Sequence, residues 1–165
     1  MTHATAFAEP LTARIAAFIR EVGLRVEPAT LDEATLLPGV TVRGGAILVD
    51  PSRLAHPGDL LHEAGHLAVT EAARRATLAA VGDEPGEEMA AIAWSYAAAR
   101  HLGLDPAIVF HAAGYRGGAQ AILTAFETGE AFGTPLLEWW GMTLGRKSAA
   151  ARGEPPFPHM RRWLR

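Results

Sequence analysis

The run LLHEAGHLAV, residues 60–69, places two histidines four residues apart in apolar surroundings. Residues four apart on an α-helix project from nearly the same face, so His62 and His66 can offer two imidazole nitrogens to one ion. Glu63 lies about 100° round the helix axis, where a carboxylate can act on a water beside the metal without binding the metal. The run predicts a hydrolytic zinc site. The alternative is a buried helix whose histidines bond to backbone carbonyls, which is costly for this set of polar side chains.

A catalytic zinc ion usually takes three protein ligands, so a third must lie elsewhere. The spacing HExxHxxGxxH would supply another histidine, but Val69 and Ala72 stand at its glycine and histidine positions. The next predicted helix begins with Glu87 and Glu88. Glu88 shares a face with a stripe of small side chains suited to close helix packing, whereas Glu87 points in a direction that we expect to be more solvated. We predict Glu88 as the third ligand and keep Glu87 as the alternative.

A peptidase site also needs a donor for the tetrahedral oxyanion, usually a histidine, tyrosine or arginine. His111, Tyr115 and Arg116 lie close together in VFHAAGYRGG, where the glycines could let the backbone approach a cleft. We take His111 and Tyr115 as candidate catalytic residues. The alternative for each is an ordinary core residue on an apolar helix.

The elements around the motif follow from apolar spacing and turn residues. Helical spacing over 11–22, bounded by a proline and a glycine, predicts an amphipathic helix. Residues 24–38 predict a short strand and then either an irregular segment or one helical turn. The stretch VTVRGGAILVDP predicts a hairpin over about 40–50, with a tight turn at its two glycines.

Helices dominate the rest of the chain. One is expected from about Leu60 through the arginines at 74 and 75, and another from Glu87 to about Leu102. Three short helices are expected in AIVFHAAGY, GGAQAILTAFETG and TPLLEWWGM. Residues 146–165 mix small, proline and basic residues, and predict a linker and a terminal segment that is either poorly ordered or packed.

The composition limits the ligands and partners. The 165 residues suffice for one compact domain with its own core. There is no cysteine, so any metal must be held by His, Asp or Glu. A net charge of -3 gives no global field that would attract nucleic acid or an anionic membrane. No signal-like segment or membrane-spanning apolar run is visible, and we expect a cytoplasmic protein.

The residues around the motif resemble a known family. ILVDPSRLAHPGDLLHEAGHLAV resembles the strand, helix entry and HExxH helix of the ImmA/IrrE family of gluzincin-type zincin metallopeptidases. Glu88 with Ala91, Trp94 and Ser95 resembles the glutamate helix of that family, although Ile92 stands where the family usually has asparagine. The resemblance covers about two fifths of the chain, roughly from the hairpin to the end of the glutamate helix.

The resemblance implies an α+β fold, mainly helical, in which a small antiparallel sheet packs on the HExxH helix. We expect one zincin-like metallopeptidase domain over 1–145 and a C-terminal linker and basic tail over 146–165. Zn²⁺ held by the two motif histidines and Glu88 would activate a water, with Glu63 as general base. An extended peptide would pair with an exposed edge strand, for which Ala46 to Asp50 is best placed by sequence order.

Family members are often linked to regulated cleavage of a repressor protein, sometimes with a fused helix-turn-helix domain, and this sequence shows no such domain. The expected partner is a peptide or protein substrate, with a regulatory protein among the candidates and no direct contact with nucleic acid. The main alternative function is a regulatory or interaction module that keeps the zincin fold, with zinc structural or absent. A hydrolase acting on a non-peptide amide is a third hypothesis, and the oligomeric state stays open.

Overall fold

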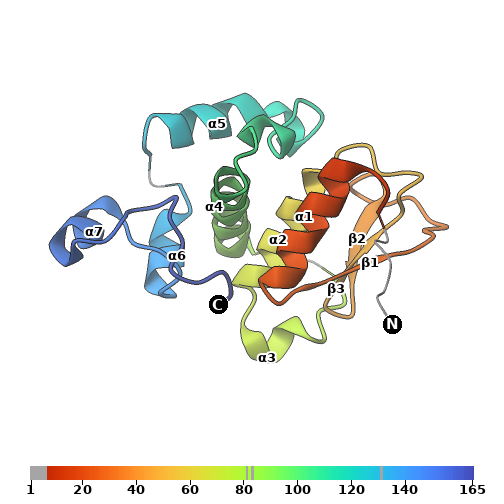
Figure 1. Cartoon of the computed structure of the whole chain (residues 1–165), viewed down its shortest axis with the longest axis horizontal. Coiled ribbons are helices and arrows are strands. Elements are labelled where there is room, and N and C mark those ends of the chain that lie inside the picture. The colour runs from red at the N-terminus through yellow and green to blue at the C-terminus, as the bar shows by residue number, and fades with distance from the viewer. Residues whose placement is uncertain (1–6, 81, 83, 131) are drawn as a thin grey trace.

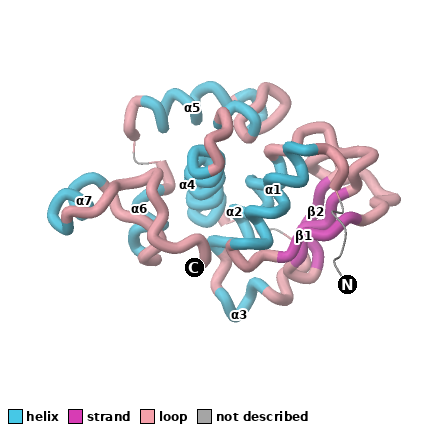
Figure 2. Tube along the Cα trace, viewed as in Figure 1, coloured by secondary structure: helices cyan, strands magenta, loops and turns pink. Residues whose placement is uncertain are grey.

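The chain forms a small sheet at one end and a group of helices that fill the rest of the molecule, so that the fold is mixed α+β (Figures 1 and 2). The computed structural model describes residues 7–80, 82, 84–130 and 132–165. In this part of the chain the α-helices are α1 (Pro10–Glu21), α2 (Asp59–Val69), α3 (Ala72–Arg75), α4 (Pro85–His101), α5 (Ala119–Glu127), α6 (Thr134–Trp139) and α7 (Arg146–Arg152). The strands are β1 (Arg25–Pro28), β2 (Val40–Arg43) and β3 (Ala46–Val49), and the short 3-10 helices are η1 (Pro106–Ile108) and η2 (Tyr115–Gly117).

The sheet has the order β1-β3-β2, with β2 antiparallel and β1 parallel to β3. The predicted hairpin is confirmed, and φ angles of 58° at Gly44 and 69° at Gly45 suit a tight primed turn. The prediction of an antiparallel sheet with an exposed strand over 46–50 is wrong, because β1 covers the second edge of β3. Among the described residues, the outer strands of the sheet are therefore β1 and β2.

Helix α2 packs against the sheet on one side and directly against α4 on another (Figure 1). Gly65 permits this contact, since a Cβ atom there would lie 2.7 Å from the carbonyl oxygen of Ala91. Fully buried side chains surround the junction of these elements: Ile15, Ile19, Ile47, Leu61 and Trp94. The packing fixes the first turn of α4 above the motif histidines of α2.

Helix α2 ends earlier than the sequence predicts. The expected helix ran through Arg74 and Arg75, but Thr70 is extended with ψ 136° and α3 starts afresh after it. The Thr70 hydroxyl donates to the carbonyl of His66 at 2.7 Å. Arg75 donates to the carbonyls of Leu67 and Thr70 at 2.9 and 3.0 Å. Side chains thus satisfy carbonyls that the end of an α-helix leaves free, and no glycine or proline marks the position.

The first of the three short helices expected after Pro106 is absent from this part of the chain, whereas α5 and α6 confirm the other two. Only η1 and η2 form between 106 and 117. Tyr115 and Arg116 have φ angles of 56° and 52°, which are incompatible with a right-handed helix. The segment is instead a folded loop beside the N-terminal end of α2.

Residues 146–165 contain α7 and a terminal segment that packs on the rest of the chain. The ring of Trp163 lies edge-on to Phe18 and Trp94, with centroid distances of 5.0 and 5.4 Å. The indole N–H of Trp94 donates to the Trp163 carbonyl at 2.9 Å, and the Arg165 amide donates to the Ala68 carbonyl at 2.9 Å. Of the two predicted states of this segment, the packed one is observed. Within the described residues, every helix is too short or too polar to cross a bilayer.

Candidate metal centre

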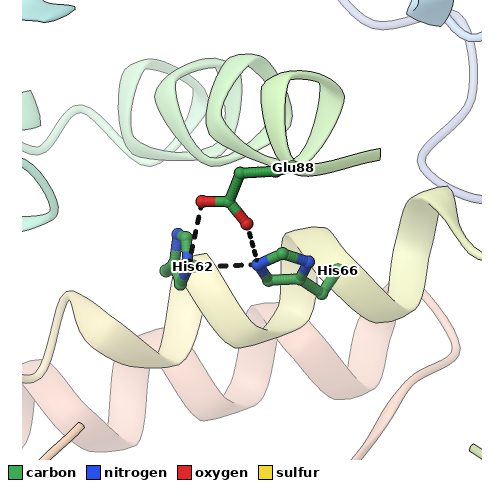
Figure 3. Close-up of side chains that lie close together, drawn as sticks. All are labelled: His62, His66 and Glu88. Carbon is green, nitrogen blue, oxygen red and sulfur yellow. Dashed lines mark hydrogen bonds and ion pairs between the residues drawn. The ribbon is translucent and has the colours of Figure 1, made fainter. Parts of the chain in front are cut away.

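His62, His66 and Glu88 meet between α2 and the first turn of α4 (Figure 3). Nε2 of His66 lies 2.9 Å from Oε2 of Glu88 and 3.1 Å from Nε2 of His62. Nε2 of His62 lies 3.9 Å from Oε1 of Glu88. The structure therefore brings together the three residues that the sequence nominates as metal ligands.

The spacing of these atoms suits a single metal ion. Two atoms bound at about 2.0–2.1 Å to a tetrahedral zinc ion lie about 3.3 Å apart, and the three distances here are 2.9, 3.1 and 3.9 Å. Two imidazole nitrogens and a carboxylate oxygen form a donor set of the catalytic zinc type. Without a cation, one of the two facing nitrogens must carry a proton, whereas an ion would satisfy both lone pairs.

Glu87, the alternative ligand, points away from the histidines. Its carboxylate lies 3.7 Å from Nη2 of Arg74 and 3.6 Å from Nη1 of Arg165. The expectation that Glu87 is the more solvated of the two glutamates is wrong, since its side chain is 11% exposed and that of Glu88 is 41% exposed. The packed terminal segment covers Glu87, and Glu88 opens onto a hollow beside the histidines. The geometry thus favours Glu88 over Glu87 as the third ligand.

The charge states of this group favour a cation. Burial lowers the pKa of His62 to about 4, with a smaller contribution from His66. The hydrogen bond from His66 lowers the pKa of Glu88 below its ordinary value, although burial acts in the opposite direction. At neutral pH His62 is therefore neutral and Glu88 is ionised, and these are the forms that bind a metal.

Glu63 occupies the position expected of a general base. Its side chain is largely buried, and it lines a hollow of about 590 Å³ together with the three candidate ligands. Burial raises the pKa of Glu63 to about 7. A carboxyl group with a pKa near neutrality can both accept and return a proton.

The ligands lie where two surface hollows meet, and we call the combined depression the trough. The first hollow, about 400 Å³, extends over Asp59 and residues 113–116, and the second extends over Glu63 and Pro85. Five residues line both hollows: Leu36, Leu37, His62, Glu88 and Arg116. Leu36 is 99% exposed on the trough wall. It could not be recognised from the sequence, because nothing local distinguishes it within an irregular segment.

His111 lies beside Asp59 rather than in the ligand cluster. Its Nε2 is 2.7 Å from Oδ1 of Asp59, and its ring stacks on His56 at 3.7 Å. Nδ1 of His111 and Oδ2 of Asp59 are buried without a hydrogen-bond partner in the described structure. Burial raises the pKa of Asp59 above its ordinary value. Asp59 could not be recognised from the sequence, since carboxylates are common in the first turn of a helix because of the helix dipole alone.

Tyr115 contacts the candidate metal ligand His62. Its hydroxyl oxygen lies 2.9 Å from Nδ1 of His62, on the opposite side of the imidazole from the Nε2 that faces Glu88. Burial raises the pKa of Tyr115 above its ordinary value, so the phenol is neutral. This contact differs from the oxyanion role that the sequence suggests for Tyr115.

Comparisons with known proteins provide no relative: no protein-family model matches the chain, and no curated protein or solved structure matches it significantly. The resemblance to the ImmA/IrrE family and to the zincin fold therefore stays a prediction that rests on the residues themselves.

Proposed function

We propose that this protein is a zinc metallopeptidase of the zincin type. The observation that carries the proposal is the convergence of His62, His66 and Glu88, whose ligand atoms lie within 4.8 Å of one another beside Glu63. Two histidines from one helix and a glutamate from the next match the ligand chemistry of hydrolytic zinc sites. The order of hairpin, HExxH helix and glutamate helix supports a zincin-like domain.

Glu63 is the proposed general base. Zinc bound by the three ligands would polarise a scissile carbonyl and lower the pKa of a water. Glu63 would take the proton from the attacking water and deliver it to the leaving amine. The same carboxyl group thus serves both proton transfers.

Arg116 is the proposed donor for the developing oxyanion. Of the three candidates, His111 is paired with Asp59, and the hydroxyl of Tyr115 is directed to His62. Arg116 is exposed and lines both hollows of the trough. A guanidinium beside the ligands can stabilise negative charge that develops on the substrate.

An extended peptide or protein is the proposed substrate, within the cytoplasm. Hollows on both sides of the ligands give an extended chain room to cross them. Strand β2 is an outer strand of the described sheet, and its first residue, Val40, is bridged to Leu37 on the trough wall. It therefore replaces β3 as the candidate partner for the substrate backbone. Leu36 offers an exposed apolar surface to a substrate side chain.

The alternative is an interaction module with structural zinc or none. Structural zinc sites usually have four protein ligands. The described residues provide a group of three, next to an open hollow that Glu63 lines. This arrangement supports an enzyme over a module.

The test uses purified full-length protein loaded with zinc and a fluorogenic peptide library. Wild-type protein should bind one zinc ion and cleave peptides. Glu63→Gln should bind zinc equally well and lose about 10²–10⁴-fold in cleavage rate. Glu71→Gln, at an exposed position next to α3, is the matched control and should cleave normally. Absence of stoichiometric zinc, or full activity of Glu63→Gln, would overturn the proposal.

A further inference from the structure

The contact between Tyr115 and His62 has two parts. The phenol oxygen lies 2.9 Å from Nδ1 of His62, and the two rings meet edge-on with centroids 5.4 Å apart and an interplanar angle of 88°. The hydrogen bond fixes the rotation of the imidazole, and the edge-on ring limits its tilt. Both parts act on the side of His62 that lies away from Glu88.

The backbone that carries Tyr115 adopts a conformation that ordinary residues avoid. Tyr115 and Arg116 both have positive φ angles, 56° and 52°, and a bulky residue in the left-handed region is a true outlier. Such outliers persist where the surrounding structure holds them and are concentrated at functional sites. Here the unusual backbone directs the phenol to a candidate metal ligand.

The segment before Tyr115 is fastened to the first turn of α2. Nε2 of His111 bonds to the buried carboxylate of Asp59, and the Phe110 ring packs on Tyr115 with centroids 5.3 Å apart. The backbone of Gly58 lies so close to Ile108 that a Cβ atom at Gly58 would clash with its carbonyl. The loop and the ligand helix are therefore held as one unit.

We infer that Tyr115 is a positioning residue for His62, and that the Asp59–His111 pair holds the loop that presents it. A neutral imidazole carries one N–H. When the N–H at Nδ1 donates to the phenol oxygen, Nε2 has a free lone pair directed at Glu88 and His66. Outer hydrogen bonds of this kind fix the tautomer and the ring orientation of metal-bound histidines. This inference rests on the proposed function in one respect, namely that the metal is zinc.

The test compares Tyr115→Phe with Tyr96→Phe, which removes the hydroxyl of the other tyrosine of the chain. Zinc affinity is measured by competition with a chromophoric chelator, and the fold is checked by the thermal unfolding of the metal-free proteins. Tyr115→Phe should lose about 10–100-fold in zinc affinity, as is typical when such an outer partner is removed, with little change in the unfolding temperature. Tyr96→Phe should retain the wild-type affinity.

A second measurement reports the hydrogen bond itself. In zinc-loaded wild-type protein, the nitrogen NMR spectrum should show His62 protonated at Nδ1, with a proton protected from exchange that becomes labile in Tyr115→Phe. Equal zinc affinity of Tyr115→Phe and wild type, or an unprotected Nδ1 proton in wild type, overturns the inference. Zinc binding without peptide cleavage by wild type overturns the proposed function and leaves the inference standing, whereas absence of zinc binding by wild type overturns both.

Discussion

Gly65 of α2 lies against the backbone of Ala91 of α4, at a distance where even a methyl group would meet the Ala91 carbonyl oxygen at 2.7 Å. Gly65 stands between the two motif histidines, and Ala91 lies one turn after Glu88 on its own helix. The separation of the two helices at this point therefore sets the distance between the histidines and the glutamate.

Gly65→Ala should weaken both the fold and the metal site. The added methyl group must push α4 away, and overpacking of this kind typically costs about 1–3 kcal/mol, partly offset by about 1 kcal/mol of helix propensity. Urea denaturation and zinc titration measure the two effects. Gly86→Ala is the control, because a Cβ atom there meets only the flexible Leu136 side chain at 3.4 Å. Wild-type zinc affinity in Gly65→Ala would show that the helix separation does not control the site.

Glu88→Gln should lower zinc affinity and Glu87→Gln should not, although the two residues are adjacent. Glu88→Gln removes the anionic ligand and should lower zinc affinity by more than the roughly 10–100-fold that loss of an outer partner costs. Glu87→Gln removes ion pairs with Arg74 and Arg165, worth about 1 kcal/mol or less, and should leave zinc affinity unchanged. Isothermal titration of each variant with zinc measures the affinity. A larger loss of zinc affinity in Glu87→Gln than in Glu88→Gln would make Glu87 the ligand.

The ligand positions could be predicted from the sequence because they depend on local geometry. His62 and His66 share a helix face through spacing alone. Glu88 required one further step, namely that the next helix returns its first turn to the motif, and the stripe of small side chains on the Glu88 face, suited to close helix packing, indicated that step. The hairpin was predictable for the same reason, since its two glycines define a tight turn.

Contacts between distant segments were not predictable in this way. No local pattern indicates that β1 adds to the edge of β3, that the Arg75 side chain satisfies carbonyls at the end of α2, or that the terminal segment covers Glu87. Each of these depends on the packing of segments far apart in the chain. The roles of His111 and Tyr115 were also hidden, because their partners, Asp59 and His62, are about 50 residues away.

Trp163→Ala should destabilise the whole domain, because the ring that it removes packs edge-on against Phe18 and Trp94. Loss of a large aromatic side chain at a partly buried site should cost about 2–4 kcal/mol. Trp139→Ala is the matched control, since that side chain is 84% exposed and its loss should change stability by less than about 0.5 kcal/mol. Urea denaturation of both variants measures the difference, and equal stabilities would mean that the Trp163 ring contributes nothing to the core.

The metal-free protein should become less stable as the pH rises, because of the titration of Glu63. Burial raises the pKa of Glu63 from 4.5 to about 7 in the folded state. Between these values the unfolded chain loses its proton while the folded chain keeps it, so the unfolded state binds fewer protons and folding weakens as pH rises. At roughly 1.4 kcal/mol per pKa unit, the loss between pH 4.5 and 7 is about 3 kcal/mol.

Glu63→Gln isolates this effect, because His62 and the other titrating groups are present in both proteins. With a chelator present, the unfolding free energy of wild type minus that of Glu63→Gln should decrease steadily from pH 4.5 to 7 and level off above pH 7. Denaturant titrations at half-unit pH intervals measure this difference. A difference that does not vary with pH would show that Glu63 ionises in the folded protein as readily as in water, and would remove the basis for its role as a base with a near-neutral pKa.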